Sequence, residues 1–163
     1  MALGGEIVRA RQLTLAATAR AVGLARRATH EALVSWQAAH AEETATLLVS
    51  ELVTNAVRHA QTGGSALVLR LETAGSWLRI EVHDADPRVP EPRTPDRLDG
   101  SGFGFVLIEA LADNWGSSRG HDRQGRVGGT RHATARRSGG LSRSAAREFL
   151  AAARGALRGA VTT

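Results

Sequence analysis

The run Leu47-Leu-Val-Ser-Glu-Leu-Val-Thr-Asn-Ala-Val-Arg-His-Ala60 is apolar and helix-forming, yet it holds a carboxylate at Glu51 and a carboxamide at Asn55. Residues four apart share one helix face, about 6 Å apart along the axis. Asn is a poor residue for a helix interior, whereas its side-chain oxygen is a suitable Mg²⁺ ligand. A carboxylate one turn away could accept a proton from a hydroxyl or water. An ordinary solvated helix stripe is the alternative interpretation of this pair.

The segment Val82-His-Asp84 ends an alternating strand pattern on an acid. Leu78, Ile80 and Val82 share one face, and Asp84 continues their phase, which predicts a carboxylate on the helix-covered side of a sheet. Because a buried acid needs a hydrogen-bond donor, we expect Asp84 to receive a ligand N–H, such as the amino group of adenine. A strand-end acid that meets solvent or caps a turn is the alternative.

A glycine cluster, Gly100-Ser-Gly-Phe-Gly104, opens the next predicted helix, where free backbone N–H groups and the helix dipole favour phosphate. Glycine-rich turns also commonly just start helices. The cluster lacks the Lys-Ser/Thr ending of a P-loop, and the chain contains no lysine that could replace it. It also does not directly follow a strand, as a dinucleotide-binding fingerprint would. Taken together, the three segments predict one nucleotide pocket.

The composition predicts one globular domain. The chain has 163 residues, of which 42% are hydrophobic and 23% charged, and this length is sufficient to bury a core. It contains no cysteine, so disulfides, thiolate metal sites and cysteine nucleophiles are excluded. No apolar run approaches the roughly 18 residues of a membrane span, and the N-terminus does not resemble a secretory signal. We therefore expect a cytoplasmic protein.

The charge of the chain is positive but comes from one residue type. All 21 basic residues are arginine, and the net charge is +5. A chain rich in Ala, Gly and Arg but without lysine indicates biased coding composition rather than selection for nucleic acid. A basic tail can bind nucleic acid, but no zinc-finger spacing or aromatic RNA-binding signature accompanies it. We therefore do not expect a nucleic-acid partner.

Hydrophobic periodicity predicts helices that alternate with hairpins. The predicted strands are 11–17 (an edge strand), 66–72, 77–84, 115–119 and 130–136. The predicted helices are one of about 18 residues that ends near Trp36, followed by 42–60, 103–115 and 142–159. Residues 73–76 are a hairpin turn, and 85–101, with all four prolines, are a long loop. This order predicts an α/β (α+β) two-layer sandwich with helices on one face of a mixed, mostly antiparallel sheet.

These segments resemble the motifs of a known family. Leu47–Ala60 resembles the N box of the GHKL ATPase superfamily, which includes gyrase and the histidine kinases. Val82-His-Asp-Ala-Asp-Pro87 resembles its first glycine box in the degenerate form seen in actinobacterial proteins. Gly102-Phe-Gly-Phe-Val-Leu-Ile-Glu-Ala-Leu-Ala-Asp-Asn-Trp-Gly116 resembles the second glycine box of the anti-sigma-factor kinases, and Gly128-Gly-Thr130 is similar to the terminal box. The resemblance defines a domain over residues 10–137, followed by a linker and a basic amphipathic helix in 138–163.

The resemblance implies a Bergerat-type ATP site. On this basis Glu51 is the catalytic general base, Asn55 holds Mg²⁺, and Asp84 receives the adenine amine. The residues expected to bind the cofactors, ATP and Mg²⁺, are Asn55, Asp84, Gly100, Gly102, Gly104, Phe105 and Thr130. The sequence departs from the family pattern at Asp86, Phe103 and His132.

The small members of this family are serine/threonine kinases that sequester a sigma factor and phosphorylate an antagonist. The resemblance therefore implies a regulatory kinase in transcription, with a sigma factor, a STAS-type antagonist or both as partners. Two alternatives stay open: an ATP-binding interaction module without phosphotransfer, and a stand-alone histidine-kinase-type catalytic domain. Glu51 and Asn55 favour an enzyme over the first, and the lack of a phospho-acceptor helix argues against the second. The sequence leaves homodimerization open.

Overall fold

The computed structural model describes residues 8–60, 65–85, 108–121 and 127–136. Its strands are β1 (Val8–Ala16), β2 (Ala66–Ala74), β3 (Trp77–Asp84), β4 (Asn114–His121) and β5 (Val127–Arg136). Its helices are α1 (Arg20–Ser35), the short 3₁₀ helix η1 (Ala39–Ala41) and α2 (Glu42–His59). Residues 108–111 are also helical. The two long helices predicted from periodicity are therefore confirmed, each ending one residue earlier than expected.

The five strands form one sheet in the order β1-β2-β3-β5-β4, and every neighbouring pair is antiparallel. β1 is an edge strand, as predicted, but it begins at Val8 rather than at residue 11. The predicted hairpin joins β2 to β3, but its turn is only Gly75-Ser76, because Thr73 and Ala74 continue β2. Gly75 has a φ of 51°, and a type II′ turn needs a positive φ at this first loop position.

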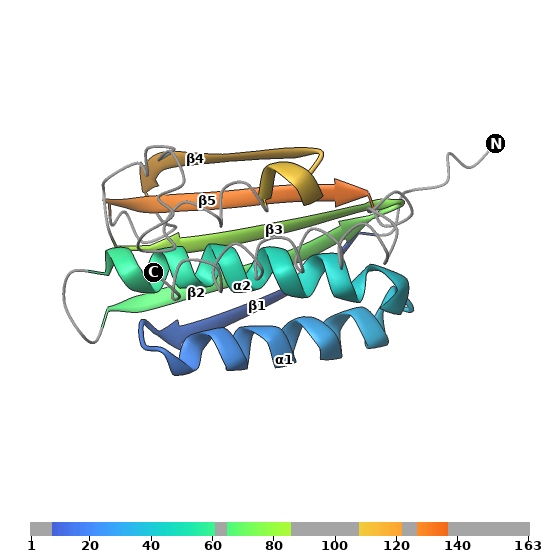
Figure 1. Cartoon of the computed structure of the whole chain (residues 1–163), viewed down its shortest axis with the longest axis horizontal. Helices are drawn as coiled ribbons and strands as arrows, with labels where there is room; N and C mark the ends of the chain where they lie inside the picture. The colour runs from blue at the N-terminus through green and yellow to red at the C-terminus, as the bar shows by residue number, and fades with distance from the viewer. Residues whose placement is uncertain (1–7, 61–64, 86–107, 122–126, 137–163) are drawn as a thin grey trace, which may run out of the picture.

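Both long helices cover the same face of the sheet (Figure 1). α1 packs on β1 and β2, whereas α2 packs on β3 and β5. β3 alternates as the sequence predicted, because Leu78, Ile80 and Val82 are all buried. Leu48 and Leu52 of α2 are buried in the same core. The predicted two-layer sandwich is confirmed, and all four strand pairings that the structure describes are antiparallel.

α2 is a continuous helix of 18 residues whose charges suit its ends. Glu42 and Glu43 lie in its first turn, and Arg58 and His59 lie in its last. Negative charge near the N-terminus and positive charge near the C-terminus both stabilise the helix dipole. The charges at its ends therefore stabilise α2, in addition to its buried apolar face.

The third predicted helix, 103–115, ends earlier than expected. Residues 108–111 are helical, whereas Trp115 lies in β4. The backbone N–H of Asp113 donates to the carbonyl of Thr134 at 2.9 Å, so the chain joins the sheet before Trp115. The sequence misled the prediction because Trp115 packs against the core, which an apolar residue can do equally well from a helix or from a strand.

The strand pair predicted at 115–119 and 130–136 is confirmed as β4 and β5, and both strands are longer than predicted. The loop after residue 85, the start of the third helix and residues 138–163 lie outside the described residues. The boundary between residues 137 and 138 therefore stays a prediction. Within the described ranges, no helix has both the length and the hydropathy of a membrane span.

Candidate functional site

The candidate site is built on the covered side of the sheet, beginning with two side chains of α2. Glu51 and Asn55 lie one turn apart, and both are half-buried. Between them, Leu52 and Val53 are buried in the core. The polar pair therefore lies at the border of the buried helix face, where neither side chain is fully solvated.

Burial raises the pKa of the Glu51 carboxyl, and the positive charge of Arg58 opposes this shift only in part. A carboxylate that is harder to ionise holds a proton more tightly, which suits a group that must accept one near neutral pH. Arg58 is not among the site residues predicted from the sequence. The signal was present in its spacing, since a residue seven positions along a helix lies two turns away on the same side.

Asp84 is the last residue of β3, and it is only 7% exposed. Its Oδ2 atom is buried, and its alternation phase is that of the core residues Ile80 and Val82. The prediction that the Asp84 carboxylate points to the helix-covered side is therefore confirmed. Burying a carboxylate costs free energy unless a hydrogen-bond donor or an opposite charge accompanies it. The burial of Asp84 therefore favours a role in a binding site.

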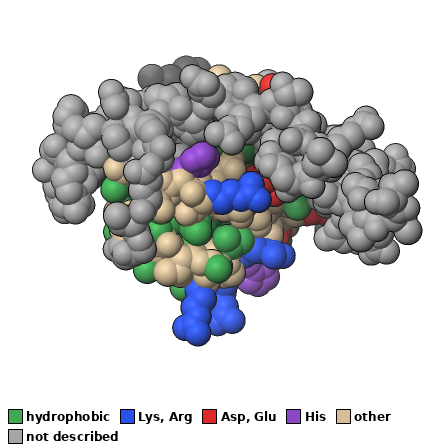
Figure 2. Space-filling model, turned by 60° about the vertical axis from the view of Figure 1, so that its left-hand side comes forward, with side chains coloured by type: hydrophobic (Ala, Val, Ile, Leu, Met, Phe, Trp, Pro, Cys, Tyr) green, Lys and Arg blue, Asp and Glu red, His purple; other side chains and the backbone are tan. Residues whose placement is uncertain are grey.

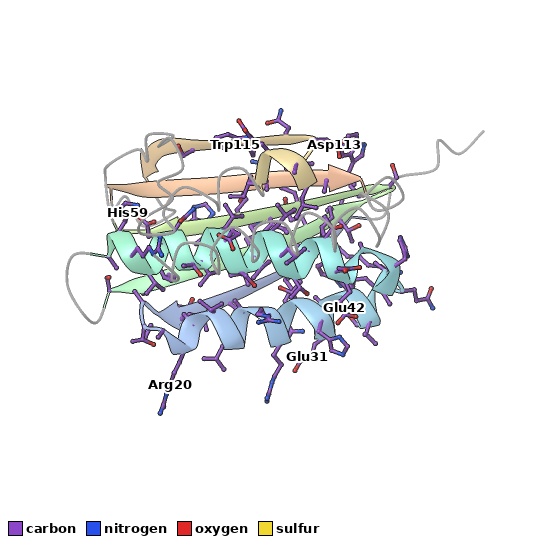
Figure 3. All side chains as sticks on the ribbon, in the orientation of Figure 1. Arg20, Glu31, Glu42, His59, Asp113 and Trp115 are labelled. Carbon is purple, nitrogen blue, oxygen red and sulfur yellow. The ribbon has the colours of Figure 1, made fainter. Side chains whose placement is uncertain are left out.

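The end of β3 and the end of α2 lie at the same end of the molecule (Figure 1). His59, the last residue of α2, is labelled at that end in Figure 3. α2 packs directly on β3. The fold therefore places Asp84 on the face that α2 covers, at the end where the helix carries Asn55 in its second-last turn.

β5 borders this site from the other side of β3. Gly129 lies opposite Asp84 in the register, and Thr130 lies opposite His83. A glycine at this register position adds no side chain beside Asp84. The predicted contact of Thr130 with phosphate stays a prediction.

The remaining predicted site residues lie outside the described part of the chain: Gly100, Gly102, Gly104 and Phe105. The described residues contain no cluster of three or more His, Cys, Asp or Glu side chains that could hold a metal ion. A Mg²⁺ ion that is shared with substrate phosphates needs only one or two protein oxygens. The carboxamide oxygen of Asn55 is a donor of this kind, so it fits such an ion.

Comparison with known proteins gives two matches. The histidine kinase-like ATPase domain family matches residues 15–128. An uncharacterized protein of Streptomyces coelicolor is 33% identical over 78 residues, which cover 47% of this chain and 74% of that protein. The family match spans α2, β3 and most of the sheet, so it includes the Glu51–Asn55 pair and Asp84.

Proposed function

The chain belongs to the histidine kinase-like ATPase domain family, and from this premise we propose that it is a regulatory protein kinase. It binds ATP with Mg²⁺ and transfers a phosphoryl group to a Ser or Thr of a partner protein. Family membership supports the ATP site. The observation that carries the proposal further is the buried carboxylate of Asp84, on the covered face beneath the helix that holds Glu51 and Asn55.

Each of these residues has a distinct role in the proposal. Asp84 accepts a hydrogen bond from the amino group of adenine and so orients the base. Asn55 holds Mg²⁺ through its side-chain oxygen. Glu51 accepts the proton of the incoming hydroxyl, and its raised pKa supports this role. Bound ATP supplies the phosphoryl group. Because phosphoryl transfer depends mainly on positioning and charge stabilisation, few protein groups are required.

The remaining assignments extend this proposal along the chain. Gly100, Gly102, Gly104, Phe105 and Thr130 complete the phosphate side of the site. The resemblance of Gly102–Gly116 to the anti-sigma-factor kinases supports a sigma factor or a STAS-type antagonist as the partner, and hence a role in transcription regulation in the cytoplasm.

The direct test is calorimetric titration of the purified chain with ATP in the presence and absence of Mg²⁺. We expect binding that Mg²⁺ strengthens, and we expect Asn55→Ala to lose that Mg²⁺ dependence. Asn114→Ala is the matched control, because Asn114 is exposed and pairs with Thr134, which lies opposite Arg79 and five residues along β5 from the partner of Asp84. A folded wild-type sample that releases no heat with millimolar ATP would refute the ATP site.

Phosphotransfer needs a second measurement. The partner is isolated by pull-down with ATP and Mg²⁺, and incorporation of radiolabelled phosphate into its Ser and Thr residues is then followed. Labelled phosphoserine or phosphothreonine supports the kinase. ATP binding with no transfer to a bound partner would instead identify an interaction module.

A further inference from the structure

The open face of the sheet, the one that α1 and α2 leave uncovered, carries two histidines beside one carboxylate. In β3, the buried core residues alternate with Glu81 and His83, so these two residues lie on the open face. In β5, His132 adjoins the buried Ala133 and therefore belongs to the open face as well. His132 departs from the family pattern, and the proposed ATP site gives it no role.

The strand register brings these three residues together. β3 and β5 are neighbours, and His132 is the direct partner of Glu81. Directly paired residues have Cβ atoms about 4.5–5.5 Å apart. The side chain of His132 lies outside the described residues, so its place in the register is what assigns it to this group. One carboxylate thus has a histidine two residues along its own strand and a second histidine across from it.

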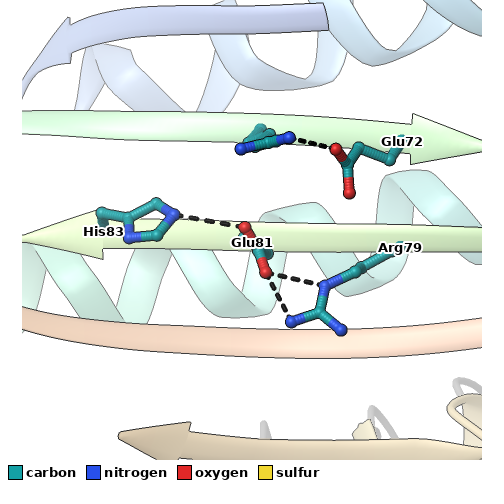
Figure 4. A network of polar contacts seen from close by, with 5 residues as sticks. Glu72, Arg79, Glu81 and His83 are labelled. Carbon is teal, nitrogen blue, oxygen red and sulfur yellow. Dashed lines mark hydrogen bonds and ion pairs between the residues drawn. The ribbon is translucent and has the colours of Figure 1, made fainter. Parts of the chain in front are cut away.

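The described pair in this group has the spacing of two metal ligands. His83 Nε2 lies 3.3 Å from Glu81 Oε2 (Figure 4). A nitrogen and an oxygen that both bind a tetrahedral Zn²⁺, each about 2.0–2.1 Å from the ion, lie about 3.3–3.4 Å from each other. A hydrogen bond between such atoms is usually shorter, about 2.7–3.2 Å. The two atoms are therefore separated by the distance at which one ion could bind both.

Arg79 orients the Glu81 carboxylate without contacting the oxygen that faces His83. Two nitrogens of Arg79 bind Oε1 of Glu81, at 2.6 and 2.7 Å, whereas His83 lies beside Oε2. Hydrogen-bond partners that orient a ligating carboxylate in this way are common around metal sites. The Glu81 side chain is only 14% exposed, so its position is also restricted by packing. One oxygen is thus held in place, and the other is directed towards the histidine.

The arginines near this group do not give it a net positive charge. On the side where Figure 1 places α1, arginine side chains project from the bottom of the molecule (Figure 2). On the open face, the two arginines with described side chains are instead bound to carboxylates. Arg70 binds Glu72, and Arg79 binds Glu81. Because the charges of these four residues cancel, a divalent cation is not repelled by a local excess of positive charge.

We propose that Glu81, His83 and His132 form a binding site for a divalent transition metal ion of the Zn²⁺ type. Two imidazoles and one carboxylate are a known set of three protein ligands for zinc, with a fourth position left for water. Imidazole suits Zn²⁺, Cu²⁺ and Ni²⁺, whereas Mg²⁺ prefers oxygen ligands. The site lies on the opposite side of the sheet from Glu51, so it does not depend on the proposed kinase activity. Without the ion, Glu81 keeps its contacts with Arg79 and His83.

The first test is calorimetric titration of the full chain with Zn²⁺, without nucleotide. We expect one Zn²⁺ per chain and no comparable binding of Mg²⁺. His83→Ala and His132→Ala should each weaken Zn²⁺ binding about tenfold or more, because each removes a ligand. His30→Ala is the matched control, since His30 also contacts a glutamate, Glu42, at 2.7 Å, and this variant should bind Zn²⁺ as wild type. Circular dichroism checks that each variant is folded.

The second test separates metal binding from a structural role of His132. Cysteine is a strong zinc ligand and leucine is not, so His132→Cys should keep Zn²⁺ binding and His132→Leu should lose it. An ion that binds only the folded chain stabilises it. Zn²⁺ should therefore raise the thermal unfolding temperature of the wild type and of His132→Cys, but not that of His132→Leu.

Three results would each overturn the proposal. The first is a folded wild type that shows no saturable Zn²⁺ binding. The second is Zn²⁺ binding that His30→Ala weakens as much as His83→Ala does, which would indicate adventitious binding by surface histidines. The third is a His132→Leu variant that binds Zn²⁺ as tightly as wild type, because His132 would then not be a ligand.

Discussion

Glu51 and Glu81 lie on opposite sides of the sheet, and their pKa values are shifted in opposite directions. In the helix layer, burial raises the pKa of Glu51 in α2, and the charge of Arg58 offsets that shift only in part. On the open face, burial would also raise the pKa of Glu81, but the hydrogen bonds and charge of Arg79, together with His83, hold it below its ordinary value. The same residue type is thus harder to ionise on one side of the molecule and easier to ionise on the other.

On the open face of the sheet, the pKa of Glu81 is lowered within a network of alternating positive and negative side chains (Figure 4). Arg79 binds Glu81 through two nitrogens, at 2.6 and 2.7 Å, and His83 binds it at 3.3 Å. Arg70 binds Glu72 in the neighbouring strand. The register also places Arg70 opposite Glu81, and Glu72 opposite Arg79. Opposite charges therefore alternate both along and across the strands, which stabilises the sheet.

The comparison separates residues that stabilise the fold from residues that serve the site. Neutralised acids on the open face contribute to folding. Glu51 is held where ionisation is unfavourable, and Asp84 is buried at the end of β3. Ionisable groups whose pKa values are shifted by burial are concentrated at functional sites. Four predictions test whether this division is real.

The largest expected effect is on phosphate transfer. Glu51→Gln should lower the transfer rate about 10²–10⁴-fold, because it removes the proton acceptor, while ATP affinity stays near wild type. Glu81→Gln makes the same chemical change on the open face and should transfer phosphate normally. Radiolabelled transfer to the isolated partner measures the rate, and an ATP titration measures the affinity. Full activity in Glu51→Gln would show that Glu51 is not the base.

The next effect is on nucleotide affinity. Asp84→Asn should weaken ATP binding about 10–100-fold, since a hydrogen bond to a charged group contributes about 1.5–3 kcal/mol. The wild type should bind GTP poorly, because guanine carries a carbonyl where adenine carries the amino group. Asp113→Asn changes an exposed acid in the same way and is the control. Competition titration that finds equal ATP and GTP affinity would contradict base recognition by Asp84.

A smaller effect is expected on the stability of the open face. Glu81→Gln should lower the free energy of unfolding by about 1 kcal/mol at pH 7, a modest value because the Arg79 side chain is 47% exposed and solvent screens the pair. The folded pKa of Glu81 is lowered, so its stabilisation is present above the ordinary pKa and is lost as the pH falls through the folded pKa. Urea unfolding at several pH values should therefore show the gap between wild type and variant closing in acid. Glu109→Gln, at an exposed position, should show no such trend.

The smallest effect has the opposite sign. Glu51→Gln should raise the free energy of unfolding by about half a kcal/mol at pH 7, because an amide is easier to bury than a carboxylate. The folded pKa of Glu51 is raised, so the wild type regains this stability as the pH falls below the folded pKa. The advantage of the variant should then vanish in acid. A destabilised Glu51→Gln at neutral pH would mean that Glu51 supports the fold, and the contrast between the two sides would fail.

Sequence reasoning was most accurate where structure is local. The helix around Leu48 and Leu52, the alternation that buries Asp84 and the edge position of the first strand were all predicted from residue spacing. The predicted helix end at Trp115 was wrong. The backbone N–H of Asp113 donates to the carbonyl of Thr134, and the chain continues from there as a strand of the sheet. That bond joins residues from two separate elements, and no local pattern contains it.

By itself, the sequence determined that Glu51 and Asn55 share a helix side and that Asp84 shares the phase of its strand's core residues, because helix and strand periods are properties of the local backbone. Only the tertiary structure decided that α2 lies over β3 and that α1 lies over β1 and β2. It also decided that Glu51 and Glu81 shift their pKa values in opposite directions. Burial and the field of nearby charges depend on which elements pack together, and these are set by the whole fold rather than by neighbours in the chain.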